Sequence, residues 1–298
     1  MVPFFQARAQ AIKETGRSEI AFVSDTQAPM LIEKLYLKAH HNTRVTQLLF
    51  GAIDEKLPRC VFILGDVVAK GHRERKWRAM DQYLATLRKN DIPVYALLGN
   101  HDLMGNPIKG QEKFNMRFPD HVSTGYYKVV DSIAVVMLNS NFNKLSAEEL
   151  ARQQAFYEGT LRSLDENPGV KFTIVTCHHA PYSNSRIVGS SMAVQQKFVP
   201  QFIRSKKGKL FITGHAHLFE WFQIQGKDFL TIGGGGGLHQ PLKSEKDRLP
   251  NQAAGYDPEF HYLTVRRVAN SMVITSYQLA NDLLHMDEGY QVTVFWSQ

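Results

Sequence analysis

Short apolar runs and amphipathic segments alternate through the first hundred residues. Residues 19–24, 60–64 and 94–98 are mostly apolar runs with the length of a buried strand. Between them, residues 44–55 and 74–89 carry apolar side chains at the spacing of a helix that buries one face. Strands that alternate with helices in this way indicate a parallel or mixed sheet covered by helices.

The rest of the chain is richer in predicted strands. Residues 126–130 and 133–138 flank Asp131-Ser132 as a hairpin, and residues 170–176 and 210–213 are further apolar strands. Two more hairpins are predicted at 220–224 with 229–232 and at 262–268 with 272–277. Ser146, with Glu149 three residues later, predicts the start of a helix that runs to about residue 164. So many strands require two sheets.

Nothing in the sequence divides the chain into several domains. We find no repeat, low-complexity tail or linker, and predict one domain over residues 18–298, preceded by an arm or helix at 1–17. A further helical segment is predicted from Pro29 to about Tyr36. The five glycines from Gly233 to Gly237 predict a structural loop, and they are not a P-loop because no Lys-Ser or Lys-Thr follows them.

Composition is that of an ordinary soluble globular protein. Of 298 residues, 43% are apolar and 21% are charged, which excludes disorder. No apolar run approaches the ~20 residues that cross a bilayer, so we expect a soluble, cytoplasmic protein, although a chain trimmed of its leader would look the same. Cys60 and Cys177 lie in predicted core strands and are expected to be inert.

The formal net charge of +7 favours anionic partners. A small phosphorylated substrate fits this charge, and nucleic acid is compatible with it but not specifically indicated. The densest basic cluster spans residues 72–78, directly after a predicted strand, and the simplest interpretation is a solvated helix face. The oligomeric state has no sequence signal.

Candidate functional side chains lie directly after the ends of the predicted strands. Five apolar strands are each followed at once by side chains that bind metal ions or transfer protons. These segments are Asp25-Thr26-Gln27, Gly65-Asp66, Gly99-Asn100-His101-Asp102, His178-His179 and Gly214-His215-Ala216-His217. A single Asp or His after a strand is usually a turn or surface residue, but five such ends in one chain predict a shared metal site.

In this order, the five segments resemble the motifs of the calcineurin-like metallophosphoesterases. The resemblance spans most of the chain and implies an α/β fold, a four-layer α/β/β/α sandwich of two mixed β-sheets flanked by helices. It also implies two divalent metal ions bound by seven side chains. One ion would be held by Asp25, Gln27, Asp66 and His217, and the other by Asp66, Asn100, His178 and His215.

The remaining motif residues are given catalytic roles by the same resemblance. His101 would contact the phosphate and protonate the leaving group, and Asp102 would orient the His101 ring. His178 is preferred to His179 as the ligand because it comes directly off the strand and Tyr182 then falls where relatives often place an aromatic residue. His239, after the glycine run, is a further histidine to check for proximity to the substrate.

Two positions depart from the family pattern. Gln27 stands where the family usually has histidine, and a neutral amide oxygen makes that half of the site harder and weaker. Ala69 cannot supply the tyrosine ligand that gives purple acid phosphatases their Fe³⁺ site. The metal preference is therefore expected to be for Mn²⁺ or Fe²⁺, with Zn²⁺ or Mg²⁺ as alternatives.

The sequence thus predicts a dinuclear metal-dependent phosphohydrolase that cleaves a phosphomonoester or phosphodiester by attack of a metal-bound hydroxide. The alternative is a protein that binds phosphate groups or nucleic acid on the same fold without hydrolysing them. That alternative is motivated by the Gln27 substitution and the basic charge.

Overall fold

The structure, a computed structural model, describes residues 17–29, 42–280 and 282–295. The strands and helices of this part of the chain, in order, are β1 (Glu19–Val23), α2 (Asn42–Lys56), β2 (Cys60–Ile63), α3 (Arg78–Lys89), β3 (Val94–Ala96), α4 (Pro107–Arg117), β4 (Tyr126–Val130), β5 (Ile133–Met137), α5 (Ala147–Glu166), β6 (Phe172–Cys177), α6 (Met192–Lys197), α7 (Val199–Arg204), β7 (Gly208–Thr213), β8 (Phe219–Ile224), β9 (Lys227–Ile232), β10 (His261–Val268), β11 (Ser271–Leu279) and β12 (Met286–Phe295). The predicted arm at 1–17 and the predicted helix from Pro29 to Tyr36 lie outside the described residues, apart from Arg17 and Pro29.

The strands form two six-stranded sheets. One has the order β12-β11-β10-β1-β2-β3, in which β1, β2 and β3 are parallel and the other three run antiparallel to their neighbours. The other has the order β4-β5-β6-β7-β9-β8, with parallel strands in the middle and an antiparallel strand at each edge. The carboxyl ends of parallel strands meet at one edge of a sheet, where α/β proteins bind ligands.

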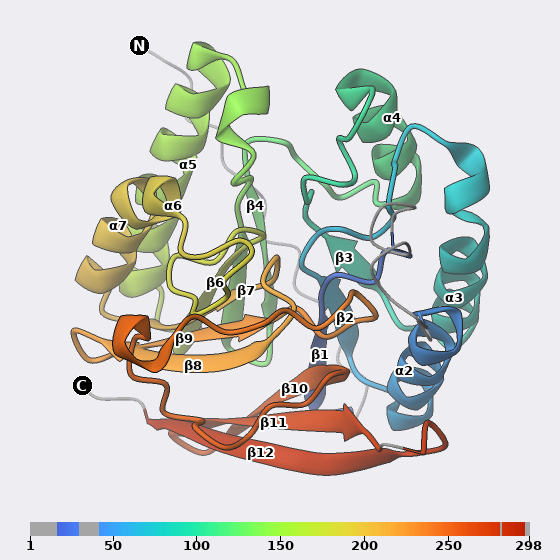
Figure 1. The fold of residues 1–298 in the computed structure, drawn as a ribbon. Helices are drawn as coiled ribbons and strands as arrows, with labels where there is room; N and C mark the ends of the chain where they lie inside the picture. The colour runs from blue at the N-terminus through green and yellow to red at the C-terminus, as the bar shows by residue number, and fades with distance from the viewer. Residues whose placement is uncertain (1–16, 30–41, 281, 296–298) are drawn as a thin grey trace.

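The two sheets pack face to face between two layers of helices (Figure 1). Side chains from both sheets, such as Phe62 and Ile174, form the core between them. Helices α2 and α3 cover the outer face of the first sheet, and α5, α6 and α7 cover the outer face of the second. The predicted four-layer α/β/β/α sandwich is therefore confirmed.

Two local predictions are confirmed at the level of hydrogen bonds and dihedral angles. The Ser146 hydroxyl accepts the backbone N–H of Glu149, and the Glu149 carboxylate accepts the backbone N–H of Ser146, which is the predicted capping box of α5. Asp131 and Ser132 have φ of 45° and 64°, so both central residues of the β4–β5 turn are left-handed, as a tight hairpin requires.

The helix predicted at residues 74–89 is interrupted. A 3₁₀ turn covers Glu74–Lys76, and α3 begins only at Arg78. Trp77 lies at the junction, fully buried, and its indole N–H donates to the carbonyl of Gly71 at 2.8 Å. The side chain that the helical pattern assigned to the apolar stripe therefore also anchors the loop that precedes the helix.

Several elements were not predicted, namely α4, α6, α7 and β12. Strand β12 pairs with β11 at the sheet edge, and most of its side chains are exposed or half-buried, so it has no continuous apolar run. Helix α4 had a usable signal, because Asn106 caps it with Pro107 in the first turn.

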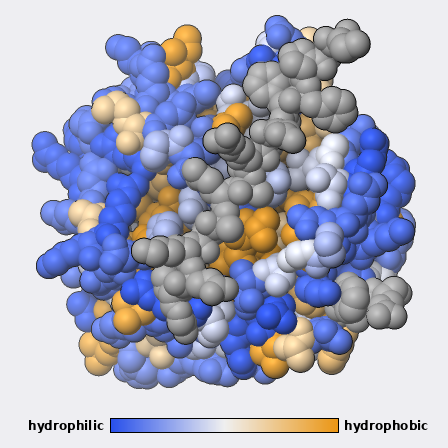
Figure 2. Space-filling view, turned by 180° about the vertical axis from the view of Figure 1, so that it is seen from behind, coloured by the Kyte–Doolittle hydropathy of each residue, from blue (hydrophilic) through white to orange (hydrophobic). Residues whose placement is uncertain are grey.

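The described helices include none that is long and apolar enough to cross a membrane. Seen from behind, the surface is mostly hydrophilic, with hydrophobic residues gathered mainly near the centre of that face (Figure 2). Cys60 and Cys177 are both buried free thiols, as predicted for inert core positions.

Candidate metal centre

Five strands of the two sheets end in polar side chains that converge inside the molecule. The residues concerned are Asp25 after β1, Asp66 after β2, Asn100 after β3, His178 after β6, and His215 and His217 after β7. Asp25, Asp66 and His215 have φ of 59°, 49° and 67°, a left-handed conformation that is unfavourable for residues with a side chain. Such conformations tend to cluster at functional sites, where the surrounding structure holds them.

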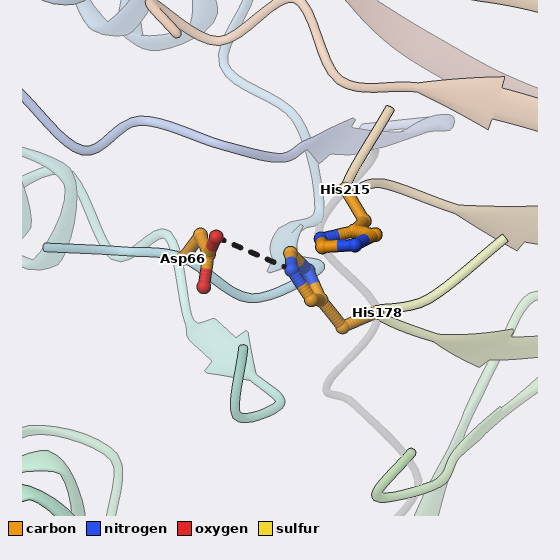
Figure 3. A group of neighbouring side chains, drawn as sticks. All are labelled: Asp66, His178 and His215. Carbon is orange, nitrogen blue, oxygen red and sulfur yellow. Dashed lines mark ion pairs between the residues drawn. The ribbon is translucent and has the colours of Figure 1, made fainter. Parts of the chain in front are cut away.

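One half of the site is built around Asp66. Asp66, His178 and His215 each offer a ligand atom within 4.8 Å of the other two (Figure 3). Nε2 of His178 lies 3.3 Å from a carboxylate oxygen of Asp66 and 3.1 Å from the amide oxygen of Asn100. A Cβ on Gly99 would lie 2.1 Å from Oδ1 of Asp66, so the carboxylate can occupy this place only beside a glycine. One carboxylate, one amide oxygen and two imidazoles suit Mn²⁺, Fe²⁺ or Zn²⁺.

The other half is built around Asp25. Nε2 of His217 lies 3.4 Å from Oδ1 of Asp25 and 3.5 Å from the amide nitrogen of Gln27. Oδ1 of Asp25 and Oε1 of Gln27 are buried and make no hydrogen bond with any described residue. Buried oxygens without a donor are costly unless a cation compensates them. These two oxygens therefore fit a metal ion, and the side chains of Asp25 and Gln27 both lie beside Nε2 of His217.

Backbone carbonyls orient two of the imidazoles. Nδ1 of His178 lies 2.9 Å from the carbonyl oxygen of Leu64, and Nδ1 of His217 lies 2.8 Å from that of Leu238. A carbonyl can only accept, so both rings carry a proton on Nδ1, and Nε2 of each ring faces a carboxylate. This is the usual outer-shell arrangement of metal-binding histidine.

The charges of the site are arranged as carboxylate–imidazole pairs. Burial alone would lower the pKa of His178, but the Asp66 carboxylate outweighs it and raises that pKa to about 9. Burial would likewise raise the pKa of Asp66, yet His178 holds it at about 2. Burial and neighbouring imidazoles lower the pKa of His215 well below its ordinary value, which keeps this ring neutral. A cation bound between these groups would take the place of the imidazolium proton.

His101 lies beside Asp66 at the rim of the site. Its backbone N–H donates to Oδ1 of Asp66 at 2.7 Å, and its ring lies 3.8 Å from the other carboxylate oxygen. The His101 side chain keeps 12% of its surface exposed, whereas Asp66 is buried, so the ring is partly accessible to solvent.

The surroundings of Asp102 differ from the prediction. Its carboxylate accepts the backbone N–H groups of Gly99, Val67 and Val68 at 2.9, 3.4 and 3.1 Å, while the His101 ring contacts the carbonyl of Ala69 at 3.4 Å. Asp102 therefore joins the loops after β2 and β3 and has no hydrogen bond to the ring that it was predicted to orient. Burial, together with the nearby Asp66 charge, raises the pKa of Asp102 to about 7.

The two histidines of the doublet have different surroundings. His178 contacts Asp66 and Asn100, whereas Nδ1 of His179 lies 2.8 Å from the Ser140 hydroxyl. The His179 ring packs 4.4 Å from the ring of His215, and burial lowers its pKa to about 3. Ser140 was not identified from the sequence, because a lone serine after a strand has no distinguishing pattern.

The glycine run closes over the first motif. The backbone N–H groups of Gly235 and Gly237 donate to the carbonyls of Ser24 and Asp25 at 2.9 and 3.0 Å. The loop after the run then continues to Gln240, whose N–H donates to the carbonyl of His217. The predicted structural loop is thus confirmed, and it braces the ligands of the Asp25 half.

Two other residues considered from the sequence lie apart from the ligands. The Tyr182 ring packs edge-on against Phe229 at 4.9 Å, in the core beneath the helices of the second sheet. Nε2 of His239 is 2.9 Å from the carboxylate of Asp257, and that partner raises the pKa of His239. His239 is therefore a rim residue with a partner of its own.

The loop 180–191 is fixed by buried polar residues that sequence reasoning missed. The Glu220 carboxylate accepts the Ser183 hydroxyl at 2.7 Å and the Asn184 N–H at 2.8 Å. The Ser185 hydroxyl donates to Gln240 at 2.6 Å, which links the loop to the segment that braces His217. Glu220 lies in a mostly apolar strand, and its partner Ser183 is 37 residues away in the chain. No local pattern therefore indicates the role of Glu220.

The family model for calcineurin-like phosphoesterases matches residues 18–219, and the chain belongs to this family. The match contains all five motifs that carry the resemblance. No curated protein matches the chain.

Solved structures share the fold. A Plasmodium protein described as GAP50, the anchor in the inner membrane complex, is 15% identical with a TM-score of 0.68, over 94% of this chain and 89% of that one. A dimetal phosphatase from Danio rerio is 14% identical with a TM-score of 0.61, over 94% and 99%. The purple acid phosphatase PPD1 from yellow lupin is 13% identical with a TM-score of 0.68, over 93% of this chain and 53% of that one.

Proposed function

We propose that the protein is a dinuclear metal-dependent phosphohydrolase that cleaves a phosphomonoester or phosphodiester. The observation that carries the proposal is the convergence of Asp66 and His178, both buried, with the half-buried His215, beside oxygens of Asp25 and Gln27 that accept no hydrogen bond. A cluster of this kind is expensive to bury without cations.

The proposed ligand set divides into two overlapping groups. Asp25, Gln27, Asp66 and His217 would hold one ion, and Asp66, Asn100, His178 and His215 the other. Oxygen and imidazole donors without sulfur favour Mn²⁺ or Fe²⁺, with Zn²⁺ and Mg²⁺ as weaker alternatives. When bound, two such ions supply charge for the phosphoryl oxygens and lower the pKa of a water molecule towards neutrality.

The protein residues around this centre have separate tasks in the proposal. Asp66 would bind both ions, and the Leu64 and Leu238 carbonyls keep the rings of His178 and His217 in the orientation that presents Nε2. His101, at the rim, would donate a proton to the departing oxygen of the substrate. Asp102 would keep the His101 loop in place through the backbone of Gly99.

Turnover is the experiment that tests the proposal, because the fold also occurs in a protein described as an anchor. The protein is stripped with a chelator, dialysed, and assayed on p-nitrophenyl phosphate before and after addition of Mn²⁺. We expect no hydrolysis without the metal and hydrolysis with it. Mn²⁺ binding without hydrolysis of mono- or diesters would instead support the phosphate-binding alternative.

The role of His101 has its own test. General acid catalysis is typically worth ~10²–10⁴-fold and matters less as the leaving group improves. His101→Ala should therefore lose much more activity on an alkyl phosphate than on the nitrophenyl ester, while metal content stays at two ions. An equal loss on both esters together with loss of metal would make His101 a ligand or a structural support.

A further inference from the structure

The loop after β2 places cations beside His101. Lys70 is half-buried, and Arg73 and Arg75 are exposed. Within the described part of the chain, none of the three forms an ion pair. The one acidic residue of this loop, Glu74, is bound by Lys113 and Arg117 of α4, so its charge is already compensated. The loop therefore presents uncompensated positive charge next to the metal centre.

This loop is packed firmly against the loop that carries His101. The Ala69 carbonyl contacts the His101 ring at 3.4 Å, so Lys70 is the next residue along the rim. A Cβ on Gly71 would lie only 2.1 Å from the carbonyl oxygen of Asp102, which shows how closely the two backbones approach. The positions of Lys70 and Arg73 relative to His101 are therefore set by backbone contacts.

The side chain of Arg73 is held at one end. Nδ1 of His72 lies 2.8 Å from the Met104 carbonyl, which can only accept, so His72 is protonated at Nδ1 and its Nε2 accepts. Nε of Arg73 donates to that Nε2 at 3.4 Å. The two terminal guanidinium nitrogens then remain for an external ligand, and a planar guanidinium binds phosphate in a bidentate manner.

We infer that Lys70 and Arg73 form a subsite for a second phosphate, carried by the leaving group of the substrate. The inference rests on the proposed function, in which His101 faces the departing oxygen. A leaving group above His101 extends towards the next part of the rim, where Lys70 and Arg73 lie. The substrate class is thus a phosphate ester whose alcohol is itself phosphorylated.

The test compares propyl phosphate with 1,3-propanediol bisphosphate, which carries a second phosphate group at the other end of the same carbon chain. For the wild-type protein loaded with Mn²⁺, we expect kcat/KM to favour the bisphosphate by at least about tenfold, the lower end of what a charged cleft contributes through substrate attraction. The double variant Lys70→Gln with Arg73→Gln should lose this preference, mainly through KM, and keep the wild-type kinetics on propyl phosphate. The double variant Lys206→Gln with Lys246→Gln removes two exposed cations elsewhere and serves as the control for net charge.

The possible outcomes distinguish failure of the phosphate subsite from failure of the proposed phosphohydrolase function. Equal kcat/KM for both esters in the wild type would overturn the subsite, and so would a preference that survives in the double variant. Loss of the preference in the Lys206→Gln, Lys246→Gln control as well would overturn the subsite, because the preference would then depend on overall charge. If the wild type cleaves none of the three esters, propyl phosphate, the bisphosphate and p-nitrophenyl phosphate, the proposed function itself is overturned.

Discussion

The two halves of the candidate metal centre are built from different donors. The half around Asp66 combines a carboxylate with the amide of Asn100 and two imidazoles, His178 and His215. The half around Asp25 has one imidazole, His217, and the neutral amide of Gln27. Oδ2 of Asp25 already accepts the backbone N–H of His215 at 2.8 Å, so only Oδ1 remains without a donor.

This difference indicates two metal sites of unequal strength. Replacing an imidazole by an amide removes a donor that binds transition metals well and leaves a harder, weaker ligand. We therefore expect the Asp66 half to retain its ion and the Asp25 half to exchange its ion with the solution.

The largest effect is expected from Asp66→Ala, because Asp66 is proposed to bind both ions. It should remove both ions and lower turnover by well over the roughly 10–100-fold that loss of an outer-shell partner costs. Elemental analysis after Mn²⁺ loading and dialysis, with a parallel turnover assay, measures it. Near-normal turnover in this variant would show that Asp66 does not bridge the two halves.

A pair of histidine variants separates the halves. His178→Ala should reduce the metal content of the dialysed protein below one ion, whereas His217→Ala should leave one ion in the Asp66 half. His285→Ala is the matched control, since this exposed histidine is paired with Asp282 and Asp287 and should leave metal binding unchanged. If His217→Ala lost metal as completely as His178→Ala, the two halves would not be independent.

Gln27→His should have the smallest effect and the most specific one. It restores the ligand that the family usually has, so Zn²⁺ affinity of the weaker half should rise by about tenfold, equivalent to about 1.4 kcal/mol. Competition between Zn²⁺ and Mn²⁺, followed by elemental analysis, measures the change. The same exchange at the exposed Gln223 of β8 is the control. An unchanged metal profile would mean that Gln27 does not coordinate.

The sequence was most informative where local pattern alone decides the structure. Buried parallel strands have continuous apolar runs, so β1, β2, β3, β6 and β7 could be predicted, and their ends located the seven ligand candidates. The capping box of α5 could be predicted from two residues alone, Ser146 and Glu149, which are three positions apart. Strand β12 was not predicted, because it forms at a sheet edge with mostly exposed side chains and depends on β11 for its hydrogen bonds.

Contacts between distant segments could not be predicted in the same way. Asp102 was predicted to orient its sequence neighbour His101. Its carboxylate instead accepts the backbone N–H groups of Val67 and Val68, 35 and 34 residues earlier in the chain. Ser140 beside His179 and Glu220 beside Ser183 are similar cases. Each depends on which segments the strand order of a sheet brings together, and no local pattern encodes that order.

The most direct test of unequal metal sites is a calorimetric titration of the stripped protein with Mn²⁺. We predict two ions bound in two resolved steps, a tight first step and a weaker second step. In Gln27→His, titration with Zn²⁺ should bring the second step closer to the first. Two ions bound with one common affinity in the wild type would contradict the inequality, and no binding at all would contradict the metal centre.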